Sequence, residues 1–121
     1  MPHPADAPRA TILVVDDDRA LRTLVAAALR NEGHRVITAG DGTEALSTLE
    51  GTQVELIVSD VAMPGVDGRE MSQALWERRR HIPILFMSSH PQQPELLPGA
   101  FIAKPFRYDD LLARVRELLS R

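Results

Sequence analysis

The sequence predicts an α/β fold in which helices cover both faces of a parallel sheet. Short apolar runs, each the length of one buried strand, alternate with segments whose apolar residues recur at helical spacing. Such alternation is typical of βαβ crossovers, which are right-handed. With 121 residues, 44% of them hydrophobic, the chain has room for one domain with a single core.

Composition excludes several kinds of site and partner. The chain has no cysteine, which excludes disulfides, thiolate metal sites and a thiol nucleophile. A net charge of −3 argues against direct nucleic-acid binding, which usually needs a basic surface. No apolar run approaches the ~20 residues of a membrane span, so no membrane insertion is expected. We expect residues 1–9, with three prolines and no secretory signal, to be a flexible lead-in to a domain over residues 10–121.

The first half of the chain contains two predicted strands and two predicted helices. An apolar run over residues 11–15 predicts the first strand, and the helix after it has Asp18 as a candidate N-cap and Gly33 beyond its end. The apolar stripe of this helix comprises Leu21, Leu24, Val25, Ala28 and Leu29. Residues 35–39 form the second strand, and a short helix over 43–50 follows a glycine-rich break.

The second half is organised around an apolar run over residues 56–60, which ends on the carboxylate of Asp60. A turn rich in proline and glycine follows it, as expected after a buried parallel strand. The remaining predicted elements are a helix over 69–79, a strand over 83–87, a strand over 100–103 and a helix over 109–120. The last helix lacks a good N-cap, because Arg107 precedes it.

Polar side chains stand at the carboxyl ends of four predicted strands. Asp16 and Asp17 follow the first, Asp60 ends the third, Ser88 follows the fourth and Lys104 follows the fifth. In a parallel sheet these ends share one edge, so the side chains converge. Clustered carboxylates repel one another unless a proton or a cation neutralises them, and Mg²⁺, or Mn²⁺ in its place, prefers such oxygens. A carboxylate in this setting can attack a phosphoryl group whose charge the metal and an ammonium neutralise.

Four ordered motifs resemble the receiver domain of two-component response regulators. They occupy residues 14–18, 59–68, 82–88 and 104–106, and the likeness runs from Ala10 to the C-terminus. The resemblance implies a CheY-like, flavodoxin-like doubly wound sheet of five strands in the order 2-1-3-4-5. It also implies a cytoplasmic phosphoacceptor in a phosphorelay, whose partner is a histidine kinase or a histidine phosphotransfer protein. It implies no conventional enzyme, only self-phosphorylation and slow autodephosphorylation.

The resemblance also implies roles for individual residues at the acidic end of the sheet. Asp60 matches the phosphoacceptor, and Asp17 matches the residue that binds the metal directly. Asp16 matches the acid that holds metal-bound water, while Asp60 and the backbone carbonyl of Ala62 complete the metal ligands. Ala62 and His90 flank the expected path of water to the phosphate, where the family tunes phosphate lifetime. His90 is otherwise a solvated loop histidine.

A second set of residues matches the family's conformational switch. Ser88 corresponds to the switch hydroxyl, Lys104 to the family's lysine and Phe101 to an aromatic residue that rotates inward when the hydroxyl moves. The resemblance implies that the peptide bond between Lys104 and Pro105 is cis.

The sequence departs from the family pattern between the fourth and fifth strands. This span is short, and the three prolines at 91, 94 and 98 exclude a normal helix where the family has its fourth. We therefore expect a shortened or missing fourth helix, and an altered output face. Similar short spans occur in receivers of hybrid histidine kinases, so both a single-domain regulator and an excised kinase domain remain open. The oligomeric state is also open.

Two other functions compete with the receiver interpretation. A Mg²⁺ phosphatase of the haloacid dehalogenase-like class would use the Asp-x-Asp pattern of Asp16 and Asp18, but it leaves Asp60 unexplained. A phosphorylation-independent pseudo-receiver scaffold would not need the five site residues. Among the other charged residues, the basic run over 78–81 predicts a solvated helix end and Asp67 predicts a turn residue.

Overall fold

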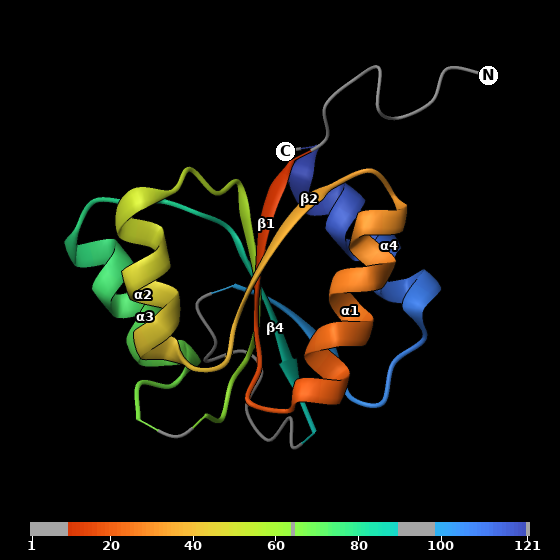
Figure 1. Ribbon diagram of the computed structural model, residues 1–121, viewed down its shortest axis with the longest axis horizontal. Helices are drawn as coiled ribbons and strands as arrows, with labels where there is room; N and C mark the ends of the chain where they lie inside the picture. Colours follow the sequence, from red (N-terminus) through yellow and green to blue (C-terminus); the bar gives the residue numbers. More distant parts are fainter. Residues whose placement is uncertain (1–9, 64, 90–98, 121) are drawn as a thin grey trace.

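The computed structural model describes residues 10–63, 65–89 and 99–120, which form a parallel sheet between two pairs of helices (Figure 1). The strands are β1 (Thr11–Val15), β2 (Arg35–Ala39), β3 (Leu56–Asp60), β4 (Ile84–Ser88) and β5 (Ala100–Ala103). The helices are α1 (Arg19–Asn31), α2 (Gly42–Gly51), α3 (Gly68–Glu77) and α4 (Tyr108–Leu119). All strand pairs are parallel, and the order β2-β1-β3-β4-β5 confirms the predicted fold class.

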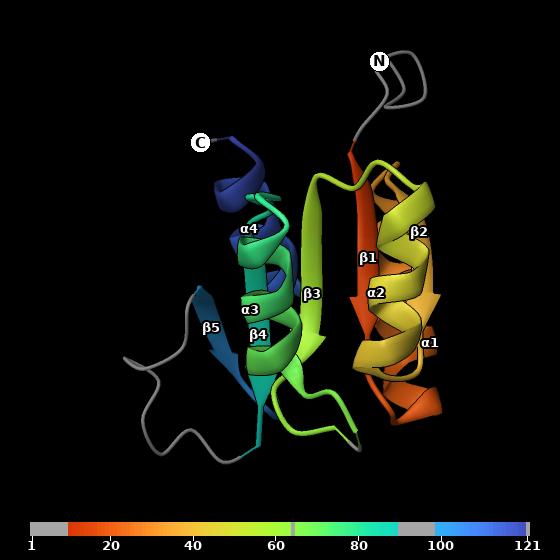
Figure 2. The same cartoon turned by 90° about the vertical axis from the view of Figure 1, so that its left-hand side faces the viewer.

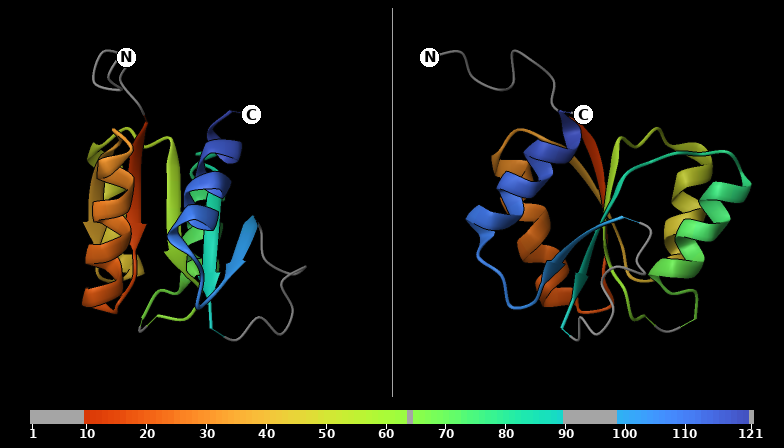
Figure 3. Two further views of the ribbon diagram at one scale, coloured as in Figure 1. Left: turned by 90° about the vertical axis from the view of Figure 1, so that its right-hand side faces the viewer. Right: turned by 180° about the vertical axis from the view of Figure 1, so that it is seen from behind.

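Each face of the sheet has its own apolar core. Ile12 and Val14 of β1 point toward α1 and α4, whereas Leu13 and Val15 point toward α2 and α3. Figure 3 shows α1 and α4 on one face, and Figure 2 shows α2 and α3 on the other. Because both faces are covered, the strands are apolar at nearly every position rather than alternating, which is the pattern that the sequence showed.

Aspartates set the starting points of three helices. Asp18 accepts hydrogen bonds from the amides of Ala20 and Leu21, as the N-cap prediction requires. Asp41 caps α2, and Asp67 forms a capping box with Glu70 at the start of α3. Asp67 is therefore a helix cap rather than the predicted turn residue. Arg107 provides α4 with no side-chain cap, as expected.

The buried stripe of α1 differs from the prediction at one position. Leu24 is 56% exposed, whereas Val25, Ala26 and Leu29 are buried. The buried stripe therefore includes Ala26 in place of Leu24. Gly33 follows the helix with φ of 95°, which confirms its predicted place just after the C-cap.

The basic run at the end of α3 is only partly solvated. The helix ends at Glu77, earlier than predicted, and Arg79 adopts a left-handed φ of 56°. Arg80 turns back and donates to the backbone carbonyls of Leu49 and Thr52 at the end of α2. Its charge thus complements the dipole of α2 rather than that of α3.

Three sequence predictions fall outside the described residues: the flexible lead-in over 1–9, the shortened or missing fourth helix within 90–98, and the role of His90. The described part of the chain contains four helices. None of these combines the length and apolar character needed to cross a bilayer.

Gly68 allows α3 to begin directly against the end of β3. A Cβ atom at this position would lie 2.8 Å from the carbonyl oxygen of Asp60 and 3.0 Å from the ring of Phe86. Both neighbours are fixed, one by the backbone and one by burial in the core. The absence of a side chain at Gly68 therefore helps to set the position of Asp60.

We predict that Gly68→Ala lowers the free energy of unfolding by about 1–3 kcal/mol, because the new methyl group must displace backbone or a packed ring. Gly51→Ala is the matched control: nothing lies within 4 Å of a Cβ there. It should be neutral or stabilise the helix by up to ~1 kcal/mol. Urea unfolding monitored by circular dichroism measures both, and equal effects of the two substitutions would contradict the steric argument.

Candidate functional site

The carboxyl ends of the strands meet at the lower edge of the sheet in Figure 1, where three carboxylates gather. Asp16 and Asp17 directly follow β1, and Asp60 is the last residue of β3. Their carboxylate oxygens lie within 4.8 Å of one another. Asp16 is buried, Asp60 is half-buried and Asp17 is exposed, so the cluster opens toward solvent on the Asp17 side. The structure therefore brings together the acids that the strand-end argument selected.

Lys104 supplies the positive charge nearest to this cluster in the described residues. Its Nζ atom lies 3.0 Å from Oδ2 of Asp16 and 3.6 Å from Oδ2 of Asp60. Its backbone amide donates to the carbonyl of Ser88 at 2.8 Å, which ties the end of β5 to that of β4. The peptide bond to Pro105 is cis, as expected.

Asp16 is held in place through both its side chain and its backbone. Its Oδ1 accepts from the amide of Asp18 at 2.8 Å, and its own amide donates to the carbonyl of Ala39 at 3.2 Å. The guanidinium of Arg22, one turn into α1, donates to the carbonyl of Asp16 at 2.7 Å. Arg22 was not selected from the sequence, because an arginine six residues after an aspartate forms no motif. The fully bonded Asp16 is a fixed electrostatic group.

The pKa of the Asp60 carboxyl is raised above its ordinary value. Burial is the largest cause, because it penalises the charged form. The ammonium of Lys104 opposes this shift, whereas the negative charges of Asp16 and Asp17 add to it. Burial and the neighbouring carboxylates thus make the ionised form of Asp60 less favourable, in spite of Lys104.

The other predicted site residues lie at different distances along the strands from this edge of the sheet. Ser88 is the last residue of β4 and is half-buried. Phe101 pairs in register with Phe86 and packs against the core on the α2 and α3 side. Ala62 lies exposed in the loop after Asp60, and Asp67 is not among the clustered acids.

The donor set suits a hard divalent cation. Three carboxylates with a single nearby ammonium leave a net negative charge, and their oxygens are the ligand type that Mg²⁺ and Mn²⁺ prefer. Burial is the main cause of the raised pKa of Asp60, and the negative charges of Asp16 and Asp17 add to it, so the cluster would gain from further positive charge. A cation between Asp16, Asp17 and Asp60 would supply it.

Comparison with known proteins identifies a shared family. Residues 12–116 match the family described as the response regulator receiver domain. The chain is 35% identical over 116 residues to the transcriptional regulatory protein TcrA of Mycobacterium tuberculosis, covering 91% of this chain and 46% of TcrA. It is 38% identical to the response regulator MprA of a Mycobacterium species, covering 50% of that protein. The chain spans about half the length of these curated relatives.

Solved structures show the same fold. The receiver domain of the Francisella response regulator 1452 superposes with a TM-score of 0.85 at 28% identity, over 93% of this chain and 98% of that one. The response regulator TrrA of Thermotoga maritima, solved in complex with Mg²⁺ and BeF, gives a TM-score of 0.81 at 27% identity. This match covers 91% of this chain and 99% of that one.

The raised pKa of Asp60 predicts a pH-dependent effect of Asp60→Asn. At pH values just above the ordinary pKa of 3.8, the Asp60 carboxyl stays protonated in the folded chain but is ionised in the unfolded chain. The contribution of Asp60 to stability therefore falls as pH rises through this window. Without divalent cations, Asp60→Asn should be more stable than wild type near pH 7, and the difference should shrink toward about pH 4. Urea unfolding across this range tests it, and a difference that is independent of pH would contradict it.

Proposed function

The chain belongs to the response regulator receiver family, and on that premise we propose that Asp60 accepts a phosphoryl group from a phosphohistidine of a histidine kinase or a histidine phosphotransfer protein. One observation carries the proposal. Asp60 lies in contact distance of both an acidic cluster and the ammonium of Lys104, with its side chain 13% exposed. We further propose that residues 10–121 form the receiver domain.

The transfer step follows from the groups at the site. An Oδ atom of Asp60 attacks the phosphorus, a new O–P bond forms, and the N–P bond of the phosphohistidine breaks with its electrons returning to the imidazole. Lys104 neutralises charge on a transferring oxygen, and the hydroxyl of Ser88 donates to another. The attack requires the ionised form of Asp60, which Lys104 favours.

Three carboxylates and one carbonyl would hold the metal. In this proposal Asp17 and Asp60 would bind it directly, Asp16 would hold one of its waters, and the backbone carbonyl of Ala62 would complete the protein ligands. Bound there, Mg²⁺ or Mn²⁺ supplies charge neutralisation to the phosphoryl oxygens. The fixed position of Asp16, with its oxygens bonded to Asp18 and Lys104, orients this part of the shell.

We propose that phosphorylation of Asp60 acts on β4 and β5 through Ser88 and Phe101. When the Ser88 hydroxyl turns toward the phosphoryl group, it vacates space beside β5, and Phe101 rotates into it. The hydrogen bond from Lys104 to the Ser88 carbonyl keeps the ends of the two strands together during this change. Ala62 and His90 are proposed to set how readily water reaches the phosphate.

The alternative phosphatase mechanism fits the geometry poorly. It needs Asp16 as nucleophile and Asp18 as general acid, but Asp16 is fully buried and Asp18 caps α1. A pseudo-receiver scaffold would not require three acids and a lysine at one strand edge.

Phosphorylation should require Asp60. Incubated with acetyl phosphate and Mg²⁺, the wild-type protein should gain the mass of one phosphoryl group, and Asp60→Asn should gain none. Lys104→Met should lose most of the labelling, because about 10²-fold or more in rate depends on such a charge. Asp110→Asn, an exposed acid at the start of α4, is the control and should label normally. Intact-mass spectrometry measures all four, and equal labelling of Asp60→Asn would refute the proposal.

Metal binding should stabilise the fold through Asp17. Saturating Mg²⁺ should raise the melting temperature of the wild-type protein. At a Mg²⁺ concentration of a hundred times the Kd, the free energy of unfolding should increase by up to about 2.7 kcal/mol. Asp17→Asn should lose most of this gain, whereas Asp110→Asn should keep it. Thermal unfolding with Mg²⁺ and with EDTA provides the measurement, and a gain that Asp17→Asn leaves intact would place the cation elsewhere.

A further inference from the structure

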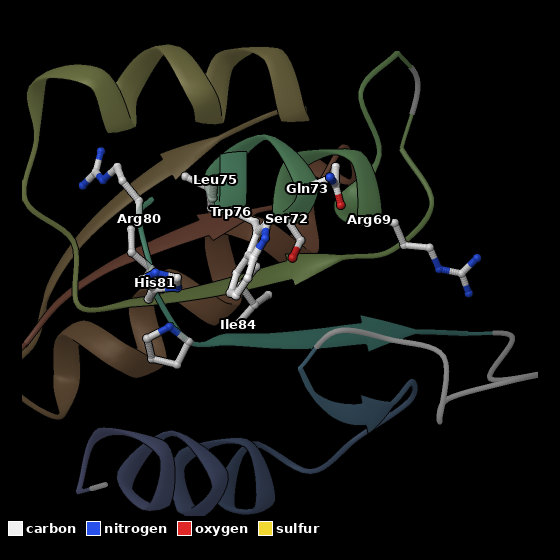
Figure 4. A pocket seen from close by; sticks show the side chains of 10 residues that line it. Arg69, Ser72, Gln73, Leu75, Trp76, Arg80, His81 and Ile84 are labelled. Atoms are coloured by element: carbon white, nitrogen blue, oxygen red, sulfur yellow. The ribbon is translucent and has the colours of Figure 1, made fainter. Parts of the chain in front are cut away.

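A groove lies beside α3, next to the start of β4, away from the acidic cluster (Figure 4). Its cavity volume is about 590 Å³, and residues that line it include Arg69, Ser72, Trp76, His81 and Ile84. Ile84 begins β4, whereas Ser88, at the other end of the same strand, lies at the phosphoacceptor edge. The groove is thus separate from the site of phosphoryl transfer.

One face of α3 forms a wall of this groove. Arg69, Ser72, Gln73 and Trp76 all line it and follow one another at the i, i+3, i+4, i+7 spacing of a single helix face. In the described part of the chain no helix lies on the α3 side of β5 (Figure 2). This face of α3 therefore has no helical neighbour among those residues.

Trp76 is an exposed aromatic anchor within the groove. Its side chain is 65% exposed, and it is the single tryptophan of the chain. The ring of His81 contacts the indole edge-on, with centroids 4.9 Å apart, so the indole rests against a neighbour while it remains open to solvent. Large aromatic side chains held in this way dominate many binding surfaces.

The charged side chains that line the groove are arginines. Arg69 and Arg80 lie at opposite ends, with Trp76 between them (Figure 4). Arg80 donates to the backbone carbonyls of Leu49 and Thr52, which are neutral, and neither arginine forms an ion pair with an acid in the described residues. The adjoining hollow contains Arg79 and Glu77, whose charges balance. Because the Arg80 guanidinium is engaged by the end of α2, Arg69 supplies the unpaired positive charge of the groove among the described residues.

We infer that this groove binds an acidic amphipathic helix of a partner protein, with an apolar side chain of that helix packed on Trp76 and a carboxylate facing Arg69. A helix laid along α3 covers the indole and reaches Arg69. The chain's net charge of −3 and the apolar centre of the groove disfavour nucleic acid.

The test uses two labelled synthetic helical peptides and fluorescence anisotropy with the complete 121-residue chain. Both peptides carry leucine on one face; the other face carries glutamate in one peptide and lysine in its twin. The glutamate peptide should bind saturably and at least about tenfold more tightly than the lysine peptide. Arg69→Glu and Trp76→Ala should each weaken it by about tenfold or more.

Matched variants elsewhere on the surface serve as controls. Arg35→Glu reverses an exposed charge on β2, and Leu24→Ala removes, on α1, the other large exposed apolar side chain of the described residues. Both should bind the glutamate peptide within about twofold of wild type. Equal binding of the two peptides, no saturable binding, or equal weakening by the control variants would each overturn the inference. Asp60→Asn should bind as wild type does, so this result is independent of phosphorylation.

Discussion

The site depends on an unbalanced set of charges at one edge of the sheet. Three carboxylates lie within 4.8 Å of one another, and a single ammonium, 3.0 Å from Asp16 and 3.6 Å from Asp60, serves them. Pairs of charges at such distances interact by several kcal/mol near a protein surface. Burial, together with the negative charges of Asp16 and Asp17, raises the pKa of Asp60, whereas both carboxylate oxygens of Asp16 accept hydrogen bonds. A bound cation would neutralise the excess negative charge of the three carboxylates, and Lys104 and the cation would then neutralise the charge of a phosphoryl group on Asp60.

Much of this site could be predicted from the sequence, because the residues with functional side chains stand at the carboxyl ends of the predicted strands. Apolar runs ending at Asp16, Asp60 and Lys104 become neighbours once the sheet is parallel, whatever the details of packing. The strand order was not accessible in this way and came from the resemblance to receivers. The predicted helix cap at Asp18 lies where an acid precedes an apolar stripe, and such local hydrogen bonds depend on few residues.

Several features that sequence analysis missed depend on how far a long side chain reaches beyond its own helix. Arg22 reaches the carbonyl of Asp16, and Arg80 reaches the end of α2 across about thirty residues. Leu24 lies on the predicted stripe, but the approach of α1 to the sheet leaves it exposed. Periodicity locates a helix face to within a residue and says nothing about where a long polar side chain ends. The two ends of strand β4 belong to two different surfaces. Ser88 lies at the phosphoacceptor site, and Ile84 lines the groove.

The most direct test of the account is to locate the phosphoryl group within the protein. After phosphorylation with acetyl phosphate and Mg²⁺, borohydride reduction converts a phosphorylated aspartate into homoserine, and peptide mass spectrometry identifies its position. The account predicts homoserine at position 60 and unmodified aspartate at positions 16 and 17. Homoserine at either of those positions instead of 60 would show that a different carboxylate carries the chemistry.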